Sequence, residues 1–122
     1  SAKLPEIAGK AALENTFFSS LYSPDDTSDL NKEFVAEYKK AYNTNPDVFA
    51  ALAYDSALLV AKAIEDAGSA DPAKIAEAMA KIKGFKGVSG EVTFNEQHNP
   101  IKSAVIIEHK DGKQTFKTKV NP

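Results

Sequence analysis

The chain has 122 residues, 43% of them hydrophobic, which is enough for one compact core but short for two. Its 15 basic and 17 acidic side chains leave a net charge of −2, which argues against nucleic acid as a partner, because that needs a basic face. The absence of cysteine excludes disulfides and thiolate zinc sites, and no apolar run reaches the about 18 residues that predict a membrane span.

Two short elements are predicted in the N-terminal part. Leu4–Ala8 has the pattern of a helix end, with Gly9 as its left-handed cap. Asn15–Ser20 contains aromatic and β-favouring residues and predicts a strand. Tyr22–Asp29 contains Pro24 and three aspartates, which is typical of a loop.

The first long helix is predicted directly after this loop. Thr27 or Ser28 is suited to the N-cap position, and Asp29 and Glu33 suit the positive end of the helix dipole. One apolar stripe follows at three- and four-residue spacing: Leu30, Phe34, Val35, Tyr38, Ala41 and Tyr42.

The second helix is the most hydrophobic stretch of the chain. Asn45 is predicted as its N-cap and Pro46 as its first residue, with Asp47 complementing the dipole and Gly68 ending the helix. The helix is apolar on almost every face as far as Lys62, which indicates a helix covered on most sides by other elements.

A third helix and then β-structure complete the chain. Asp71 and Pro72 begin this helix, Gly84 ends it, and its buried stripe is Ile75, Met79 and Ile82. Gly90–Phe94 alternates like a strand, and Ser103–Val120 predicts a hairpin whose Asp111-Gly112 pair favours a type I′ turn. The order is strand, three helices, strand and hairpin, an α/β chain with more apolar helix surface than its own strands can cover.

The residues that usually carry catalysis form no constellation. His98 and His109 lack metal-ligand spacing and are interpreted as surface histidines, and no serine lies in a nucleophile elbow. The glycines of 84–90 match no nucleotide-binding loop, and the pairs Asp25–Asp26 and Glu65–Asp66 are interpreted as solvent-facing. The sequence therefore predicts no enzyme activity, no metal and no cofactor.

Asp55 is the unusual residue, since it lies in the middle of the apolar second helix. An unpaired buried carboxylate is very costly, so three alternatives remain. The favoured one is that it accepts hydrogen bonds from a neighbouring loop; the others are solvent exposure and ligand contact. Phe49 and Tyr54 are interpreted as core residues, although Phe49, in the first turn, can project into a cleft.

Several motifs in fixed order resemble one known family. They are "FVAEYKKAY" at 34–42, "AYDSALL" at 53–59, "GVSGEVTFN" at 87–95 and "AVIIEHKDGK" at 104–113. Together they are similar to the C-terminal portion of type I periplasmic binding proteins for branched-chain amino acids, the substrate-binding components of ABC importers. The resemblance departs from the family pattern at Asn95 and at His98–Pro100, where the family has an aspartate and a Gly-Asp turn.

The resemblance implies a two-lobed, three-layer α/β/α fold of which residues 1–122 are the C-terminal portion. Residues 13–20 and the hairpin 103–120 are then expected in the second lobe, the helices of 28–84 in the first lobe, and 90–94 as a crossover strand. Most ligand-holding residues are expected upstream of Ser1. Within the chain, Phe49 is expected in the apolar wall of the ligand site, with Tyr54 and Asp55 as structural support.

The implied function is import of a branched-chain or related amino acid. The resemblance implies a small-molecule ligand, a membrane permease as partner, and a periplasmic or extracellular location that includes lipid anchoring at the cell surface. The bare apolar helix faces predict self-association of the isolated chain. Two alternatives are a sensory receptor of the same fold, which would continue into a membrane helix after Pro122, and a self-standing protein-interaction module.

Overall fold

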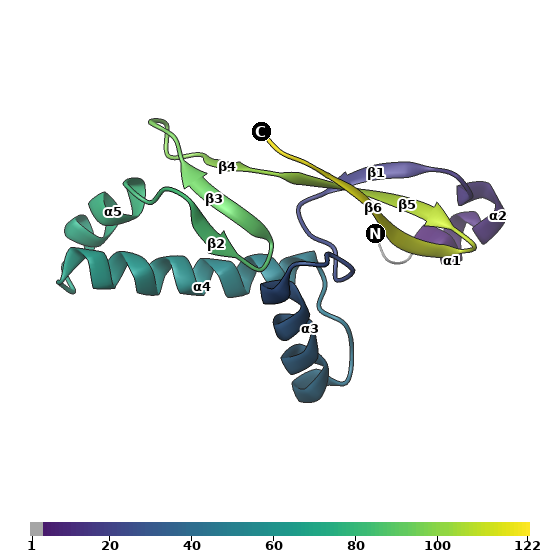
Figure 1. The fold of residues 1–122 in the computed structure, drawn as a ribbon, viewed down its shortest axis with the longest axis horizontal. Helices are drawn as coiled ribbons and strands as arrows, with labels where there is room; N and C mark the ends of the chain where they lie inside the picture. The colour runs from purple at the N-terminus through teal and green to yellow at the C-terminus, as the bar shows by residue number, and fades with distance from the viewer. Residues whose placement is uncertain (1–3) are drawn as a thin grey trace.

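The computed structural model describes residues 4–122. In chain order the elements are α1 (Leu4–Ala8), α2 (Lys10–Leu13), β1 (Phe17–Ser20), α3 (Asp29–Tyr42), α4 (Val48–Ala67), α5 (Pro72–Ala80), β2 (Phe85–Gly87), β3 (Gly90–Phe94), β4 (Pro100–Lys102), β5 (Ala104–Lys110) and β6 (Lys113–Val120). They form two antiparallel sheets, with strand orders β1–β5–β6 and β2–β3–β4. Figure 1 shows an elongated molecule with α3, α4, α5 and the second sheet at one end and the first sheet at the other.

The C-terminal hairpin forms as the sequence predicts. Asp111 and Gly112 have φ values of 52° and 69°, the two left-handed residues that a type I′ turn requires. On β5, alternate side chains are buried, among them Val105 and Ile107. The predicted alternation therefore matches the alternation of buried and more exposed side chains along this strand.

The interpretation of His109 as a surface residue is wrong, because its side chain is only 3% exposed. Its Nδ1 lies 3.0 Å from the hydroxyl of Thr16, which itself donates to the carbonyl of Leu13, so Nδ1 is the protonated nitrogen. Its Nε2 lies 3.2 Å from the side-chain amide nitrogen of Gln114, which donates to it. The imidazole is thus a structural link between the N-terminal strand and the hairpin.

The helix ends follow local capping chemistry, with two corrections. Helix α5 ends at Ala80 with Lys81 as its C-cap, and not at Gly84 as predicted. Asp71 caps α5 as predicted, accepting from the amides of Ala73 and Lys74, and Gly68 ends α4 with a left-handed φ of 56°. Helix α4 is capped by Asp47 rather than Asn45, because the Asp47 carboxylate accepts from the Ala50 amide at 2.8 Å. The helix therefore starts two residues later than Pro46 suggested.

The short elements were predicted less well. Gly9 has φ 80° and ψ 145°, which is not a left-handed cap, and a second short helix, α2, follows it. Strand β1 begins only at Phe17, after Asn15 with its positive φ of 60°. Strands β2 and β4 have three residues each and were not predicted, because so short a segment shows no alternation.

Two apolar clusters hold the helical end together. One joins α4, α5 and the second sheet and contains Leu59, Ala63, Ile82 and Val92, with Ile75 and Met79 packed against it. The other contains Tyr22, Ala51 and Val88, with Phe34 and Val48 against it. Ile82 lies beyond the end of α5 but is buried as its predicted stripe required.

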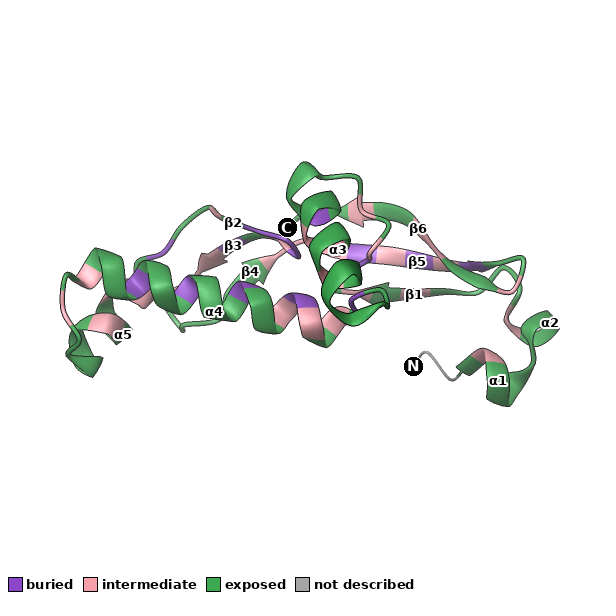
Figure 2. Cartoon of the chain, turned by 90° about the horizontal axis from the view of Figure 1, so that it is seen from below, coloured by how far each residue is buried: buried purple, intermediate pink, exposed green. Residues whose placement is uncertain are grey.

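Most residues of α3 and α4 are exposed (Figure 2), and many of them are large apolar residues. The accessible area is 8106 Å², whereas a compact protein of 13.1 kDa exposes about 6,400 Å². Helix α4 buries one stripe with a four-residue step, Ala51, Asp55, Leu59 and Ala63. The prediction of more apolar helix surface than the chain's strands cover is confirmed, and residues 4–122 do not themselves supply the expected cover of α4. Large exposed apolar side chains on α3 and α4 are Leu30, Tyr42, Phe49, Tyr54, Leu58, Val60 and Ile64.

Candidate functional site

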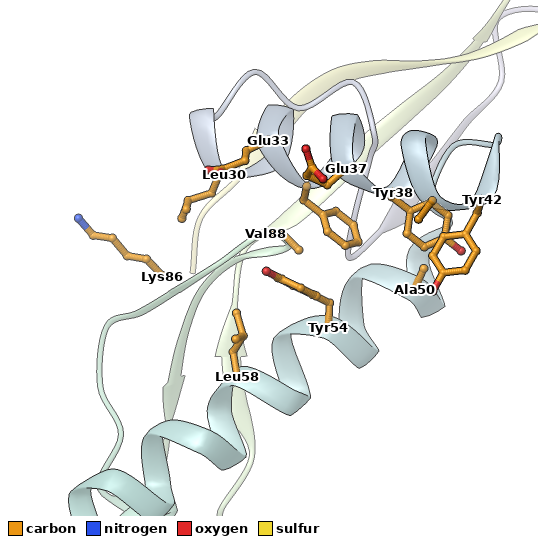
Figure 3. A pocket seen from close by; sticks show the side chains of 12 residues that line it. Leu30, Glu33, Glu37, Tyr38, Tyr42, Ala50, Tyr54, Leu58, Lys86 and Val88 are labelled. Atoms are coloured by element: carbon orange, nitrogen blue, oxygen red, sulfur yellow. The ribbon is translucent and has the colours of Figure 1, made fainter.

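An apolar groove of about 770 Å³ separates helices α3 and α4 (Figure 3). Helix α3 contributes Phe34 and Tyr38 to the groove lining, and helix α4 contributes Tyr54 and Leu58. Val88 closes one side. The remaining lining residues are Leu30, Glu33, Glu37, Ala41, Tyr42, Ala50 and Lys86. These side chains offer broad apolar contact and few directed polar groups.

Aromatic stacking organises this groove. The ring of Phe34 lies 4.8 Å from that of Tyr54, 5.7 Å from Tyr38 and 6.4 Å from Tyr22, as centroid distances. Phe34 therefore joins α3 to α4 and to the loop before α3. Tyr54 lies where it can support the helix pair, and its predicted supporting role stays a prediction.

The interpretation of Phe49 and Tyr54 as core residues is wrong, because they are 77% and 45% exposed. Phe49 is the second residue of α4, and its exposure is the highest among the large apolar residues of that helix. It does not line the α3–α4 groove. An aromatic ring held so far out of the protein has few contacts of its own, so its predicted place in a ligand wall needs a surface supplied by other residues.

Asp55 lies on the buried stripe of α4 with Ala51 and Leu59, and it is 2% exposed. Its Oδ1 accepts from the Val88 amide at 2.8 Å and its Oδ2 from the Ser89 amide at 2.9 Å, and the Ser89 hydroxyl donates to it as well. This is the hydrogen-bonded arrangement that the sequence favoured. The carboxylate connects α4 to the β2–β3 turn and is not among the residues that line the groove.

A second buried polar residue, which was not predicted from the sequence, is Asn31 on α3; it is 0% exposed. Its side-chain amide donates to the carbonyls of Ser23, Pro24 and Asp26, and its carbonyl accepts from the Tyr22 hydroxyl at 2.8 Å. Burial raises the pKa of Tyr22, so this hydroxyl keeps its proton and donates. The signal was available, because Asn31 lies three and four residues before Phe34 and Val35 on the predicted stripe.

The interpretation of Asp25–Asp26 as solvent-facing is wrong for Asp26. Its side chain is 11% exposed and forms an ion pair with Lys119 of β6. Burial alone would raise the pKa of Asp26, but hydrogen bonds from Lys119 and Ser28 outweigh it and hold the pKa below its usual range. The local sequence gave no sign of this pair, because its partners lie at opposite ends of the chain.

Lys102, at the end of β4, is a third charged group in this region. Its ammonium donates to the Ser89 hydroxyl and lies near the Asp55 carboxylate. Burial lowers the pKa of Lys102, Asp55 opposes that shift, and Lys119 adds to it. Between residues 4 and 122, no group of His, Asp or Glu side chains suits a metal ion, and no helix has the length and apolarity to cross a membrane.

The comparison with protein families decides the class of the chain. The family described as periplasmic binding protein matches residues 2–114. The chain belongs to this family. The membership confirms the resemblance inferred from the motifs and places the chain among solute-binding proteins rather than enzymes.

Relatives with known names point to amino acids. The chain is 31% identical over 119 residues to the leucine-, isoleucine-, valine-, threonine- and alanine-binding protein of Pseudomonas aeruginosa, covering 94% of this chain and 31% of the relative. It is 30% identical over 121 residues to a Leu/Ile/Val-binding protein homologue of Brucella abortus, covering 95% of this chain and 32% of the relative. The chain thus spans about a third of the length of these relatives.

Solved structures give the same fold. A leucine-binding protein of Thermotoga maritima matches with a TM-score of 0.87 and 38% identity, over 100% of this chain and 35% of that protein. A branched-chain amino acid transporter substrate-binding protein of Streptococcus pneumoniae, solved with isoleucine, matches with a TM-score of 0.84 and 34% identity, over 100% and 35%. The predicted type I periplasmic-binding-protein fold is confirmed, with the chain corresponding to part of it.

Proposed function

We propose that this chain is the C-terminal portion of an extracytoplasmic solute-binding component of an ABC importer for branched-chain or related amino acids. The observation that carries the proposal is the match of its whole length to two such proteins, one of them holding isoleucine. A binding protein for benzoate from Rhodopseudomonas palustris also matches, at 27% identity and a TM-score of 0.78. The ligand is therefore proposed as a small carboxylate with an apolar side chain.

The two sheets support a division into parts of two lobes. We assign 13–20 and 103–120, which contain the β1–β5–β6 sheet, to the second lobe, and the helices of 28–84 to the first. Residues 90–94 lead back towards the second lobe, which the chain enters after Lys102. In this arrangement the open apolar faces of α3 and α4 are covered by the first-lobe sheet of the longer protein.

Phe49 is proposed as part of the apolar wall against the ligand side chain. Its exposure at the start of α4 leaves it free for contact with a ligand held by the other residues of the longer protein. Because the polar groups for the ligand's charged ends are expected upstream, the isolated chain is expected to bind leucine, isoleucine and valine weakly or not at all.

The test is a chimera that joins residues 1–122 to the upstream two thirds of the Thermotoga leucine-binding protein. Calorimetry with leucine, isoleucine and valine should show micromolar or tighter binding by the chimera and none by the chain alone. Phe49→Ala should weaken binding by about tenfold or more, whereas Phe17→Ala, which removes an exposed aromatic of β1 that does not line the groove, should not. A folded chimera that binds none of the three, or tight binding by the chain alone, would contradict the proposal.

The proposed partners follow from the same assignment. In the longer protein, lobe closure buries the ligand and the closed form docks on the membrane permease. The proposed location is the periplasm or the outer cell surface, where a lipid anchor would hold the protein. Without the rest of the protein, the open faces of α3 and α4 are proposed to drive self-association of the chain.

A further inference from the structure

Among residues 4–122, the two ends of the molecule share no apolar cluster. Both hydrophobic clusters lie in the helical end, which comprises residues 22–102, and neither contains a residue of the β1–β5–β6 sheet. The backbone connects the ends through the loop between β1 and α3 and through Ser103 between β4 and β5 (Figure 1). Something other than apolar packing must therefore fix the angle between them.

One ion pair joins the two ends. Lys119 lies on β6, opposite Val105 of β5, and its ammonium binds the carboxylate of Asp26 in the loop before α3. The two side chains are 31% and 11% exposed, so the pair is partly shielded from water. The Ser28 amide donates to the same carboxylate at 2.9 Å, which keeps it oriented towards Lys119.

The loop that carries Asp26 is fixed to the helical end. The buried amide of Asn31 donates to three carbonyls of that loop, including that of Asp26 at 2.8 Å. Tyr22 of the same loop belongs to the cluster with Ala51 and Val88. A force on Asp26 is therefore transmitted to α3 and α4 rather than absorbed by a mobile loop.

Lys102 provides a contrast within the same region. It is also partly buried, but it binds Ser89, which is attached to α4 through Asp55, so its contacts stay within the helical end. The positive charges of Lys102 and Lys119 repel each other. Of the two lysines, Lys119 alone connects β6 to the loop before α3.

We propose that the Asp26–Lys119 ion pair is a positioning element that sets the angle between the helical end and the β1–β5–β6 sheet. The consequence for ligand binding rests on the proposed function. In a two-lobed binding protein this angle governs how far the cleft opens, so the pair biases the balance of open and closed forms without touching the ligand.

The test measures the angle directly and without ligand. The chain contains no cysteine, so Glu65→Cys on α4 and Lys113→Cys on β6 give two spin-label sites at opposite ends of the molecule. Pulsed dipolar spectroscopy on labelled chain diluted with unlabelled chain reads the intramolecular distance. We expect one narrow distance distribution for this background, and a broader, displaced one when Lys119→Met or Asp26→Asn is added.

Matched variants separate the attraction between Asp26 and Lys119 from a general loss of stability. Lys117→Met is the control, because Lys117 lies on the same strand but pairs with Glu108 inside the sheet, at 3.0 Å. It should leave the distribution unchanged, and the exchanged pair Asp26→Lys with Lys119→Asp should restore the narrow one. An unchanged distribution in Lys119→Met and Asp26→Asn, an equal effect of Lys117→Met, or no recovery in the exchanged pair would overturn the proposal.

The ligand consequence has its own readout. In the chimera described above, Lys119→Met should change leucine affinity at least threefold, while Lys117→Met should not. A displaced distance with unchanged affinity would overturn the link to the cleft. Because the distance is measured without ligand, its outcome does not depend on whether the chain serves an amino acid importer.

Discussion

The carboxylate of Asp55 offers the sharpest test of how α4 is held to the β2–β3 turn. Asp55→Ala would leave the amides of Val88 and Ser89 without acceptors, and both residues are only 6% exposed. A buried donor without a partner costs about 1–3 kcal/mol, so two cost about 2–6 kcal/mol together. Asp55→Asn keeps one acceptor oxygen and should cost about 1–3 kcal/mol, because one amide stays unpaired.

The measurement is urea unfolding followed by circular dichroism, at a protein concentration low enough to keep the chain monomeric. Asp66→Ala is the matched control, because it is the same substitution on the same helix but removes only a surface pair with Lys62, in which Asp66 is 40% exposed. Such a pair contributes at most about 1 kcal/mol. If Asp55→Ala costs no more than Asp66→Ala, the buried hydrogen bonds do not stabilise the fold as reasoned.

Gly87 allows a second, independent check on the same contact. A β-carbon added there would lie 2.5 Å from Oδ2 of Asp55 and 2.7 Å from Oδ1, so Gly87→Ala should cost about 1–3 kcal/mol through overpacking. In the Asp55→Ala background the obstructing carboxylate is gone, and the added methyl should cost little. Additive losses in this double-mutant cycle would refute the steric explanation.

Three further results are expected. Lys102→Met should leave the free energy of unfolding at pH 7 equal or higher, because burial lowers the pKa of this lysine and its charged form destabilises the fold. This stability gain should shrink as the pH rises and native Lys102 loses its proton, which urea titrations at pH 7–10 would show. The native chain should be more stable than Asp26→Asn, with the full difference present above about pH 4, the ordinary pKa of aspartate. The difference should disappear as the pH falls through the lower pKa that Asp26 has in the folded state, which urea titrations between pH 5 and 2 would show. Light scattering should detect oligomers of the isolated chain, and Ile64→Glu on the open face of α4 should reduce them; a monomer at high concentration would contradict the expected self-association.

Elements with local signals were predictable from the sequence, and those that depend on distant partners were not. The cap at Asp71 and the turn at Asp111-Gly112 follow from the chemistry of adjacent residues, so they could be placed within a residue or two. Strands β2 and β4 form only because β3 lies between them and pairs with both. His109 and Asp26 look like ordinary surface residues in sequence, since Thr16 and Lys119 are each more than 90 residues away.

The site residues divide in the same way. Asp55 could be singled out because a carboxylate in an apolar helix demands donors, although the donors themselves, on the β2–β3 turn, could not be named. Asn31 is buried on α3 in the same way but was not predicted, because its hydrogen-bond partners lie in the preceding loop and not in the helix pattern around Leu30 and Phe34. The ligand-wall role of Phe49 was predicted by family resemblance alone, and it stays a prediction.

The buried polar groups of the structure have hydrogen-bond partners, whereas much of its apolar surface is not covered. Among residues 4–122, every buried side-chain polar atom has a hydrogen-bond partner, including those of Asn31, Asp55 and His109. By contrast, the accessible area exceeds that of a compact protein of this mass by about 1,700 Å². Hydrogen bonds are directional and cannot be left unmade without a large cost, whereas an apolar face can stay exposed until a partner covers it. A chain with these two properties is expected to keep the angle between its helical end and the β1–β5–β6 sheet. It is expected to depend on the longer protein to cover its apolar faces.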